Sequence, residues 1–105
     1  APELMHKEAL NFIENNKDNP FFLYYASPLP HAPLQAPRNW VDYYQQKIGP
    51  EEPYTGKSYF PNLSPRATYA AMISYLDEQV GDIITKLQDL GLYQNTLIIF
   101  TSDNG

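Results

Sequence analysis

Two short polar clusters hold the residues whose types could carry out chemistry. The first, at residues 27–34, contains His31, and the second, at residues 101–105, contains Asp103 and Asn104. An imidazole can bind an anion or deliver a proton near neutral pH. Carboxylate and amide oxygens are ligands that hard cations such as Ca²⁺ or Mg²⁺ accept. Together the clusters could serve a reaction on an anionic group assisted by a metal ion.

Each candidate also has an ordinary structural interpretation. A histidine flanked by prolines is often a surface loop residue, and Asp-Asn-Gly is a common turn sequence. Arg38, Lys57 and Arg66 could each bind an anion, but each could equally be a solvated loop charge. A functional interpretation therefore requires that the fold bring the two clusters together.

The elements that precede the clusters would do this. Residues 21–26 (FFLYYA) and 97–101 (LIIFT) are continuously apolar, which predicts strands covered on both faces, as in a parallel sheet. Between them, residues 65–90 predict a long helix, whose apolar residues recur at steps of four and three. That stripe consists of Tyr69, Ile73, Leu76, Val80, Ile83 and Leu87. A strand–helix–strand crossover makes the strands parallel, so both clusters would meet at one edge of the sheet.

The remaining elements are less regular. Apolar spacing predicts a helix at residues 3–17, and a short helix is plausible at residues 39–47 with Asn39 as its cap. Nine of the ten prolines lie between residues 20 and 65, so the rest of that stretch predicts a long loop rich in proline and aromatic residues. Ser64 and Pro65 are typical of a helix start, and Gly91 of a helix end.

Composition narrows the classes of function. Seven Lys and Arg against twelve Asp and Glu give a net charge of −5, which argues against binding nucleic acid or an anionic membrane. No apolar run is long enough to span a bilayer, no signal peptide is visible, and there is no cysteine. One α/β domain is expected at 105 residues, but two strands are few for a buried sheet. We therefore expect a piece of a larger α/β protein.

The chain resembles the sulfatase family in three places. They are Pro20–Ala26 followed by Pro30-His31-Ala32-Pro33-Leu34, the helix segment Leu76–Ile84, and Asn95–Gly105, which ends in Thr-Ser-Asp-Asn-Gly after an apolar strand. The last phrase is quite specific, and with the Pro-His-x-Pro element it makes a strong signal. The resemblance covers nearly the whole chain and is weakest over residues 41–62.

The resemblance implies an alkaline-phosphatase-like α/β fold and hydrolysis of sulfate monoesters, with a sugar or aryl sulfate as substrate. It implies that His31 is a catalytic and substrate-binding residue that contacts the sulfate. Asp103 and Asn104 would bind a divalent cation, usually calcium, which polarises the sulfate. It also implies a periplasmic, secreted or lysosomal-type compartment, for which the chain itself carries no signal.

Departures from the family pattern matter as well. The family nucleophile is a formylglycine made from Cys or Ser within Cys/Ser-x-Pro-Ser-Arg, and Ser64-Pro65-Arg66 has the wrong spacing for it. The family's N-terminal Asp pair and a further lysine are also missing. Residues 1–105 are therefore expected to be the middle of a sulfatase catalytic domain, inactive without the rest of its parent. The alternatives are a non-catalytic sulfatase-like remnant or interaction module, or a phosphate or phosphonate ester hydrolase of the same superfamily.

Overall fold

Three α-helices form most of the regular structure. The computed structural model describes residues 2–31, 34–56 and 61–104. Within these ranges lie α1 (Pro2–Asn15), α2 (Arg38–Ile48), α3 (Pro65–Asp89) and the short 3₁₀ turn η1 (Tyr93–Asn95). The helices predicted at residues 3–17, 39–47 and 65–90 are thus confirmed to within two residues at each end. None of the helices in these ranges is long and apolar enough to cross a membrane.

The start of α3 is stabilised differently from the sequence-based prediction. Pro65 is the first helical residue and Ser64 precedes it, as predicted, but the Ser64 side chain caps no backbone amide. Its hydroxyl oxygen instead accepts a hydrogen bond from Gln45 Nε2 at 2.7 Å. The first-turn amides of Arg66 and Ala67 donate to the two carboxylate oxygens of Glu51, at 2.6 and 3.1 Å. A carboxylate from the preceding loop therefore serves as the cap, which suits the positive end of a helix.

The predicted end of α3 at Gly91 is confirmed, whereas the predicted cap of α2 at Asn39 is wrong. Gly91 follows α3 with a φ of +73°, and the Leu92 amide donates to the Leu87 carbonyl at 2.8 Å. This is a Schellman ending, which favours glycine because of the left-handed conformation. The prediction that Asn39 caps the short helix is wrong, because α2 begins one residue earlier and Pro37 occupies the capping position.

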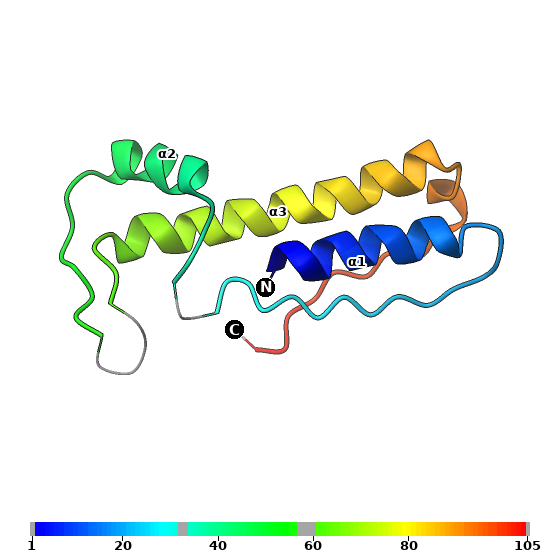
Figure 1. Cartoon of the computed structure of the whole chain (residues 1–105), viewed down its shortest axis with the longest axis horizontal. Helices are drawn as coiled ribbons and strands as arrows, with labels where there is room; N and C mark the ends of the chain where they lie inside the picture. Colours follow the sequence, from blue (N-terminus) through cyan, green and yellow to red (C-terminus); the bar gives the residue numbers. More distant parts are fainter. Residues whose placement is uncertain (1, 32–33, 57–60, 105) are drawn as a thin grey trace.

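The chain forms an elongated body measuring 50 × 27 × 24 Å. In Figure 1, α2 lies over the N-terminal half of α3, while α1 runs alongside its C-terminal half in the same direction. Tyr44 and Ser74 share a 2.8 Å hydrogen bond between α2 and α3. The α1–α3 contact carries a 2.7 Å ion pair between Glu14 and Lys86. The long helix is thus the element that both shorter helices contact.

The buried face of α3 differs from the predicted stripe. Of the stripe residues, Leu87 is buried, but Tyr69 and Ile73 are 48% and 45% exposed. The buried residues of α3 are Ala67, Thr68, Ala71, Met72, Gln79 and Leu87. Small side chains allow two helix backbones to approach closely, and α2 packs against this half of α3. The prediction that the large apolar residues form the packed face is therefore wrong for the start of the helix.

The predicted strands at residues 21–26 and 97–101 are not strands in this structure. Over the described ranges, the only β-type pairing is an isolated antiparallel bridge between Tyr54 and Asn62. Both segments nevertheless run extended and in the same direction, opposite to α3, as the strand–helix–strand prediction requires (Figure 1). A strand is defined by hydrogen bonds to a neighbouring strand, and neither segment has such a neighbour here.

The prediction that both faces of these segments are buried is also wrong. Along residues 21–26, half-buried and exposed side chains alternate, with Phe22 and Tyr24 86% and 80% exposed. The inward side packs on the helices, as shown by the edge-to-face contact between Phe21 and Phe12 of α1, with ring centroids 5.6 Å apart. In the second segment, Leu97 and Ile99 are 86% and 76% exposed. Helices therefore cover one face of the first segment, whereas every residue of the second segment is exposed, including Ile98 at 44% and Phe100 at 74%.

Candidate functional site

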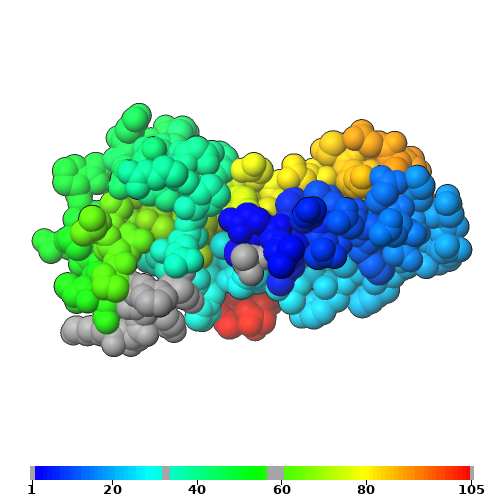
Figure 2. Space-filling model, in the orientation of Figure 1, coloured from blue at the N-terminus to red at the C-terminus, as the bar shows by residue number. Residues whose placement is uncertain are grey.

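An open cavity of about 1100 Å³ lies where the two polar clusters meet the side of α3. His31 lines it from the first cluster, and Asp103 and Asn104 line it from the second. In Figure 2 the C-terminal residues, in red, lie beside the cyan part of the chain and below the first turn of α1, in dark blue. All three predicted site residues thus border one cavity, although neither preceding segment is a paired strand.

A short turn after the first extended segment positions His31. The His31 amide donates to the Pro28 carbonyl at 2.8 Å, and the Leu29 amide donates to the Ser27 hydroxyl at 3.2 Å. The Leu29 side chain is 9% exposed and anchors the turn in the apolar interior. His31 itself is exposed, so the turn holds the backbone while its imidazole borders the cavity.

A second turn positions the acidic cluster. The Ser102 hydroxyl donates to the Asn104 carbonyl at 2.5 Å, and the Asn104 amide lies 3.4 Å from the same hydroxyl oxygen. Such local side-chain bonds are what Ser and Asn bring to turns. Ser102, Asp103 and Asn104 are all exposed, which leaves the Asp103 carboxylate accessible from the cavity.

The charge of the cavity favours a cation. Among the residues described, its lining includes the carboxylates of Glu3 and Asp103 but no lysine or arginine. A sulfate or phosphate group entering alone would meet two negative charges and an imidazole. A divalent cation bound beside Asp103 would offset this repulsion and attract the anion.

The donor set fits part of such a metal site. Asp103 and Asn104 offer carboxylate and amide oxygens, the donor types that calcium accepts. Calcium usually takes six to eight oxygens, and these two side chains supply a minority of them. Within residues 2–31, 34–56 and 61–104, no group of three or more His, Cys, Asp or Glu side chains is placed to hold a metal ion.

Sequence reasoning missed the wall that α3 contributes. Tyr69, Met72 and Tyr75 line the cavity from one side of this helix. Steps of three residues along a helix place side chains on one face, and that spacing was the available signal. Burial raises the pKa of the Tyr75 hydroxyl. Tyr69 was expected to pack in the core, but it projects an exposed ring at the cavity.

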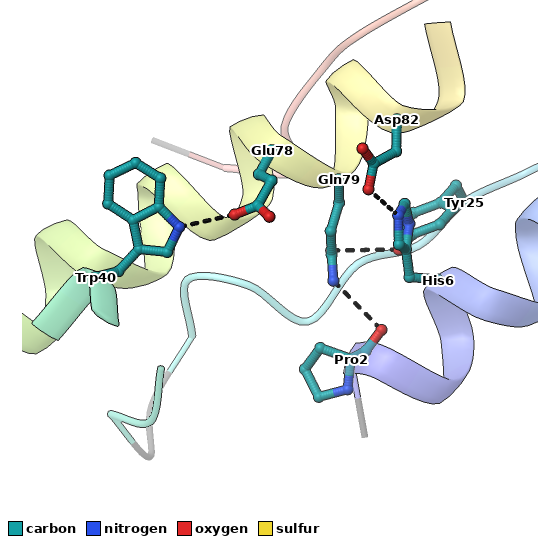
Figure 3. A network of polar contacts seen from close by, with 7 residues as sticks. All are labelled: Pro2, His6, Tyr25, Trp40, Glu78, Gln79 and Asp82. Atoms are coloured by element: carbon teal, nitrogen blue, oxygen red, sulfur yellow. Dashed lines mark hydrogen bonds and ion pairs between the residues drawn. The ribbon is translucent and has the colours of Figure 1, made fainter. Parts of the chain in front are cut away.

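A polar network, shown in Figure 3, holds the first turn of α1. Pro2 and Glu3 of that turn line the cavity. Gln79 is 1% exposed, and its Nε2 donates to the Pro2 carbonyl at 3.4 Å. The Tyr25 hydroxyl donates to Gln79 Oε1 at 3.3 Å and lies 3.4 Å from His6 Nδ1. His6 Nε2 lies 2.9 Å from Asp82 Oδ2. Burial raises the pKa of Tyr25. The network joins α1, α3 and the first extended segment.

The candidate cations of the loop do not border the cavity in the described part of the chain. Arg38 pairs with Asp42 within α2, with Nε 3.0 Å from Oδ1. Arg66 is exposed at the start of α3 and is not among the lining residues. Lys57 lies outside the described residues. Arg38 and Arg66 are therefore solvated charges, as the structural interpretation predicted, but each lies in the first turn of a helix rather than in a loop.

Comparison with known proteins identifies the family. The family model described as Sulfatase matches residues 2–105. N-acetylgalactosamine-6-sulfatase of Mus musculus is 35% identical over 105 residues, covering 98% of this chain and 16% of that protein. Arylsulfatase A of Homo sapiens is 37% identical over 89 residues, covering 85% of this chain and 14% of that protein. Arylsulfatase J of Mus musculus is 38% identical over 86 residues, covering 82% of this chain and 12% of that protein.

Two facts follow from these matches. The chain spans about a sixth of the length of the curated relatives it matches. The match nevertheless extends over almost all of the present sequence, including both polar clusters and the helix between them. This chain belongs to the sulfatase family, whose relatives here carry the names of sulfuric ester hydrolases.

Proposed function

We propose that these 105 residues are part of the catalytic domain of a longer sulfatase that hydrolyses sulfate monoesters of sugars or aryl alcohols. The supporting observation is the cavity that His31, Asp103 and Asn104 border together, in a chain matched by the sulfatase family over residues 2–105. The substrate classes follow from the printed names of the relatives, an N-acetylgalactosamine-6-sulfatase and two arylsulfatases.

In this proposal His31 contacts the sulfate group. Its imidazole can donate a hydrogen bond to a sulfate oxygen or a proton to the leaving alcohol. The backbone bond from the His31 amide to the Pro28 carbonyl holds the residue at the cavity edge. His31 would bind the sulfate and deliver a proton, while the family resemblance assigns the role of nucleophile to a formylglycine.

Asp103 and Asn104 would hold part of a divalent metal site, with calcium the expected ion. When bound, the cation supplies a Lewis acid that offsets charge on the sulfate oxygens. The acidic lining of the cavity supports this assignment, since without a cation it would repel the substrate. The remaining ligands would come from other parts of the sulfatase domain.

We also propose that residues 21–26 and 97–101 become parallel strands of an alkaline-phosphatase-like sheet when the rest of that domain is present. Two features support this: their common direction and their open apolar sides (Figure 1). Neighbouring strands would satisfy the backbone groups and cover Phe22 and Ile99. The family resemblance also leads us to expect a periplasmic, secreted or lysosomal-type compartment for the parent.

A pair of substitutions in the full-length parent tests the site. His31→Ala should lower turnover of an aryl sulfate by about 10²–10⁴-fold if the imidazole acts as an acid. It should leave calcium binding, measured by calorimetry, unchanged. Asp103→Ala should remove both activity and calcium affinity, because a charged ligand is lost. Asp89→Ala, an exposed carboxylate at the end of α3, is the matched control.

The outcomes separate the alternatives. Full activity in His31→Ala, or normal calcium binding in Asp103→Ala, would show that the roles are assigned wrongly. A parent that cleaves phosphate or phosphonate esters but no sulfate ester would be the related hydrolase. A parent with an intact reading frame, no Cys/Ser-x-Pro-Ser-Arg motif and no turnover would be the non-catalytic protein. The isolated 105-residue chain should be inactive in every case.

A further inference from the structure

Tyr69 presents a partly exposed aromatic ring to the cavity from the side of α3. Tyr69, Met72 and Tyr75 occupy one face of α3 at three-residue steps and all line the cavity. Met72 is 2% exposed, whereas Tyr69 is 48% exposed. Tyr69 is therefore a large aromatic side chain that is only partly packed and that borders the site.

Tyr69 and Tyr75 differ in their surroundings. Tyr75 is half-buried, and burial raises the pKa of its hydroxyl. For Tyr69, no hydrogen bond to the hydroxyl occurs among the residues that the structure describes. Its ring is therefore presented to the cavity without a polar anchor. Such a ring can stack against the flat apolar face of another ring.

The cavity lining combines polar and apolar groups. His31, Asp103 and Asn104 are among its polar residues, while Leu29, Met72 and the Tyr69 ring are among its apolar ones. A sulfated ring likewise combines an anionic group with an otherwise flat and largely apolar body. Ligand sites generally combine a few polar groups with apolar and aromatic lining in this way.

We propose that Tyr69 is a specificity-determining residue that binds the ring bearing the sulfate, while the polar residues bind the sulfate itself. This inference rests on the proposed sulfatase function and adds the requirement that the substrate be cyclic. The shared chemistry is a six-membered ring with an apolar face, which either a sugar or an aryl alcohol provides. Tyr69 acts through binding alone and touches no reacting atom.

Steady-state kinetics of the full-length parent test the proposal. Tyr69→Ala should raise KM for an aryl sulfate or a sugar sulfate about 3- to 10-fold, the range that loss of one aromatic contact produces. The kcat should change little, because ring binding is equal in ground and transition states. Tyr69→Phe should behave like the wild type. KM for an acyclic alkyl sulfate should not change.

Two controls guard against a merely structural effect. Tyr93→Ala removes an exposed tyrosine of η1 that does not line the cavity, and it should leave KM unaltered. Tyr69→Leu keeps an apolar side chain of useful size but removes the aromatic face, so it should resemble Tyr69→Ala. An equal rise in KM for cyclic and acyclic sulfates would overturn the proposal, as would unchanged KM in Tyr69→Ala.

A binding measurement separates this inference from the proposed function. Phenol and methyl galactopyranoside, which carry the ring without sulfate, are titrated against wild type and Tyr69→Ala by NMR. We expect one of them to bind about 3- to 10-fold more weakly to the variant, and its identity distinguishes aryl from sugar substrates. If neither sulfate ester is cleaved, the proposed function fails while this readout still stands. Equal binding of both rings to both proteins, or no binding to the wild type, would overturn the role of Tyr69.

Discussion

The helices and the two extended segments of this molecule illustrate opposite kinds of dependence on their surroundings. α1 and α3 bury Ile13 and Met72 at 1% and 2% exposure, although the chain is only 105 residues long. The extended segments are more apolar than these helices, yet Phe22 and Leu97 are each 86% exposed. Apolar composition alone therefore does not determine which residues become core.

The difference arises from backbone hydrogen bonding. A helix pairs its amides and carbonyls within itself and needs neighbours only for one face. An extended segment can pair its backbone only with another strand, so it cannot be completed locally. The helices are therefore stabilised by contacts within this chain. The two extended segments instead keep backbone groups without a strand partner and side chains exposed to solvent.

The largest expected effect separates these regions directly. Ile13→Ala in the 105-residue chain should lower the free energy of unfolding by about 2–5 kcal/mol, since it leaves a cavity beneath α1. Phe22→Ala should change it by about 0.5 kcal/mol or less, because that ring is in water. Urea denaturation followed by circular dichroism measures both. Equal losses would show that the exposed face of residues 21–26 is already packed.

In the full-length parent, the same two substitutions test whether residues 21–26 join a sheet. If residues 21–26 form a strand covered on both faces there, Phe22→Ala should cost about 3–5 kcal/mol, as for a core aromatic. A cost that stays near zero in the parent would contradict the proposed sheet. Ile13→Ala should cost about the same in both proteins and serves as the reference.

A second prediction concerns the buried polar network that joins helices to an extended segment. Gln79→Ala should destabilise the chain by about 1–3 kcal/mol, because the Pro2 carbonyl and the Tyr25 hydroxyl each lose a partner. Gln88→Ala, an exposed glutamine of the same helix, should be close to neutral. Thermal unfolding of the two variants in parallel gives the comparison. A Gln79 variant as stable as the Gln88 variant would mean that water replaces both bonds.

A third prediction concerns the unusual cap of the long helix. Glu51→Ala should cost about 0.5–2 kcal/mol, because the Arg66 and Ala67 amides lose the carboxylate that accepts their hydrogen bonds. The adjacent and exposed Glu52 provides the control, since Glu52→Ala should have almost no effect. Hydrogen exchange of the first-turn amides of α3 reports the loss locally. Unchanged protection in Glu51→Ala would rule out the capping role.

The smallest effect is expected at the surface ion pairs of α1. Hydrogen bonds from Lys17 and Lys86 lower the pKa of Glu14 to about 2, against an ordinary value of 4.5. Because the folded-state pKa is the lower one, the contribution is complete above pH 4.5 and is lost as the pH falls toward 2. The Tm difference between wild type and Glu14→Gln should shrink over that window, and 1 M salt should reduce it. Since Glu14 is 39% exposed, the difference should be modest at every pH.

Much of the candidate site could be foreseen from sequence order. The succession of an apolar segment, a long helix and a second apolar segment returns the chain in one direction, which brings His31 and Asp103 to the same end. This geometry depends on connectivity and handedness more than on strand pairing. It therefore holds here even though the predicted strands are unpaired. The chemical roles of these residues stay predictions.

Local chemistry in the sequence also determined where the helices begin and end. Apolar spacing, Pro65 at the first position of α3 and Gly91 after its end act within a few residues, so they need no tertiary partner. The same is true of the turn residues around His31 and Asn104. These signals are short-range, and the structure follows them to within two residues.

Tertiary structure alone decided which face of α3 is buried and what caps it. The large residues Tyr69 and Ile73 were expected to pack, but α2 packs with the half of the helix where Ala67 and Ala71 are buried, and Tyr69 lines the cavity. Glu51 caps α3 from fourteen residues before its first residue, Pro65. Sequence periodicity indicates how apolar one face of a helix is, but it does not indicate which other element packs against that face. That choice depends on the path of the long loop, whose prolines restrict φ without specifying its direction.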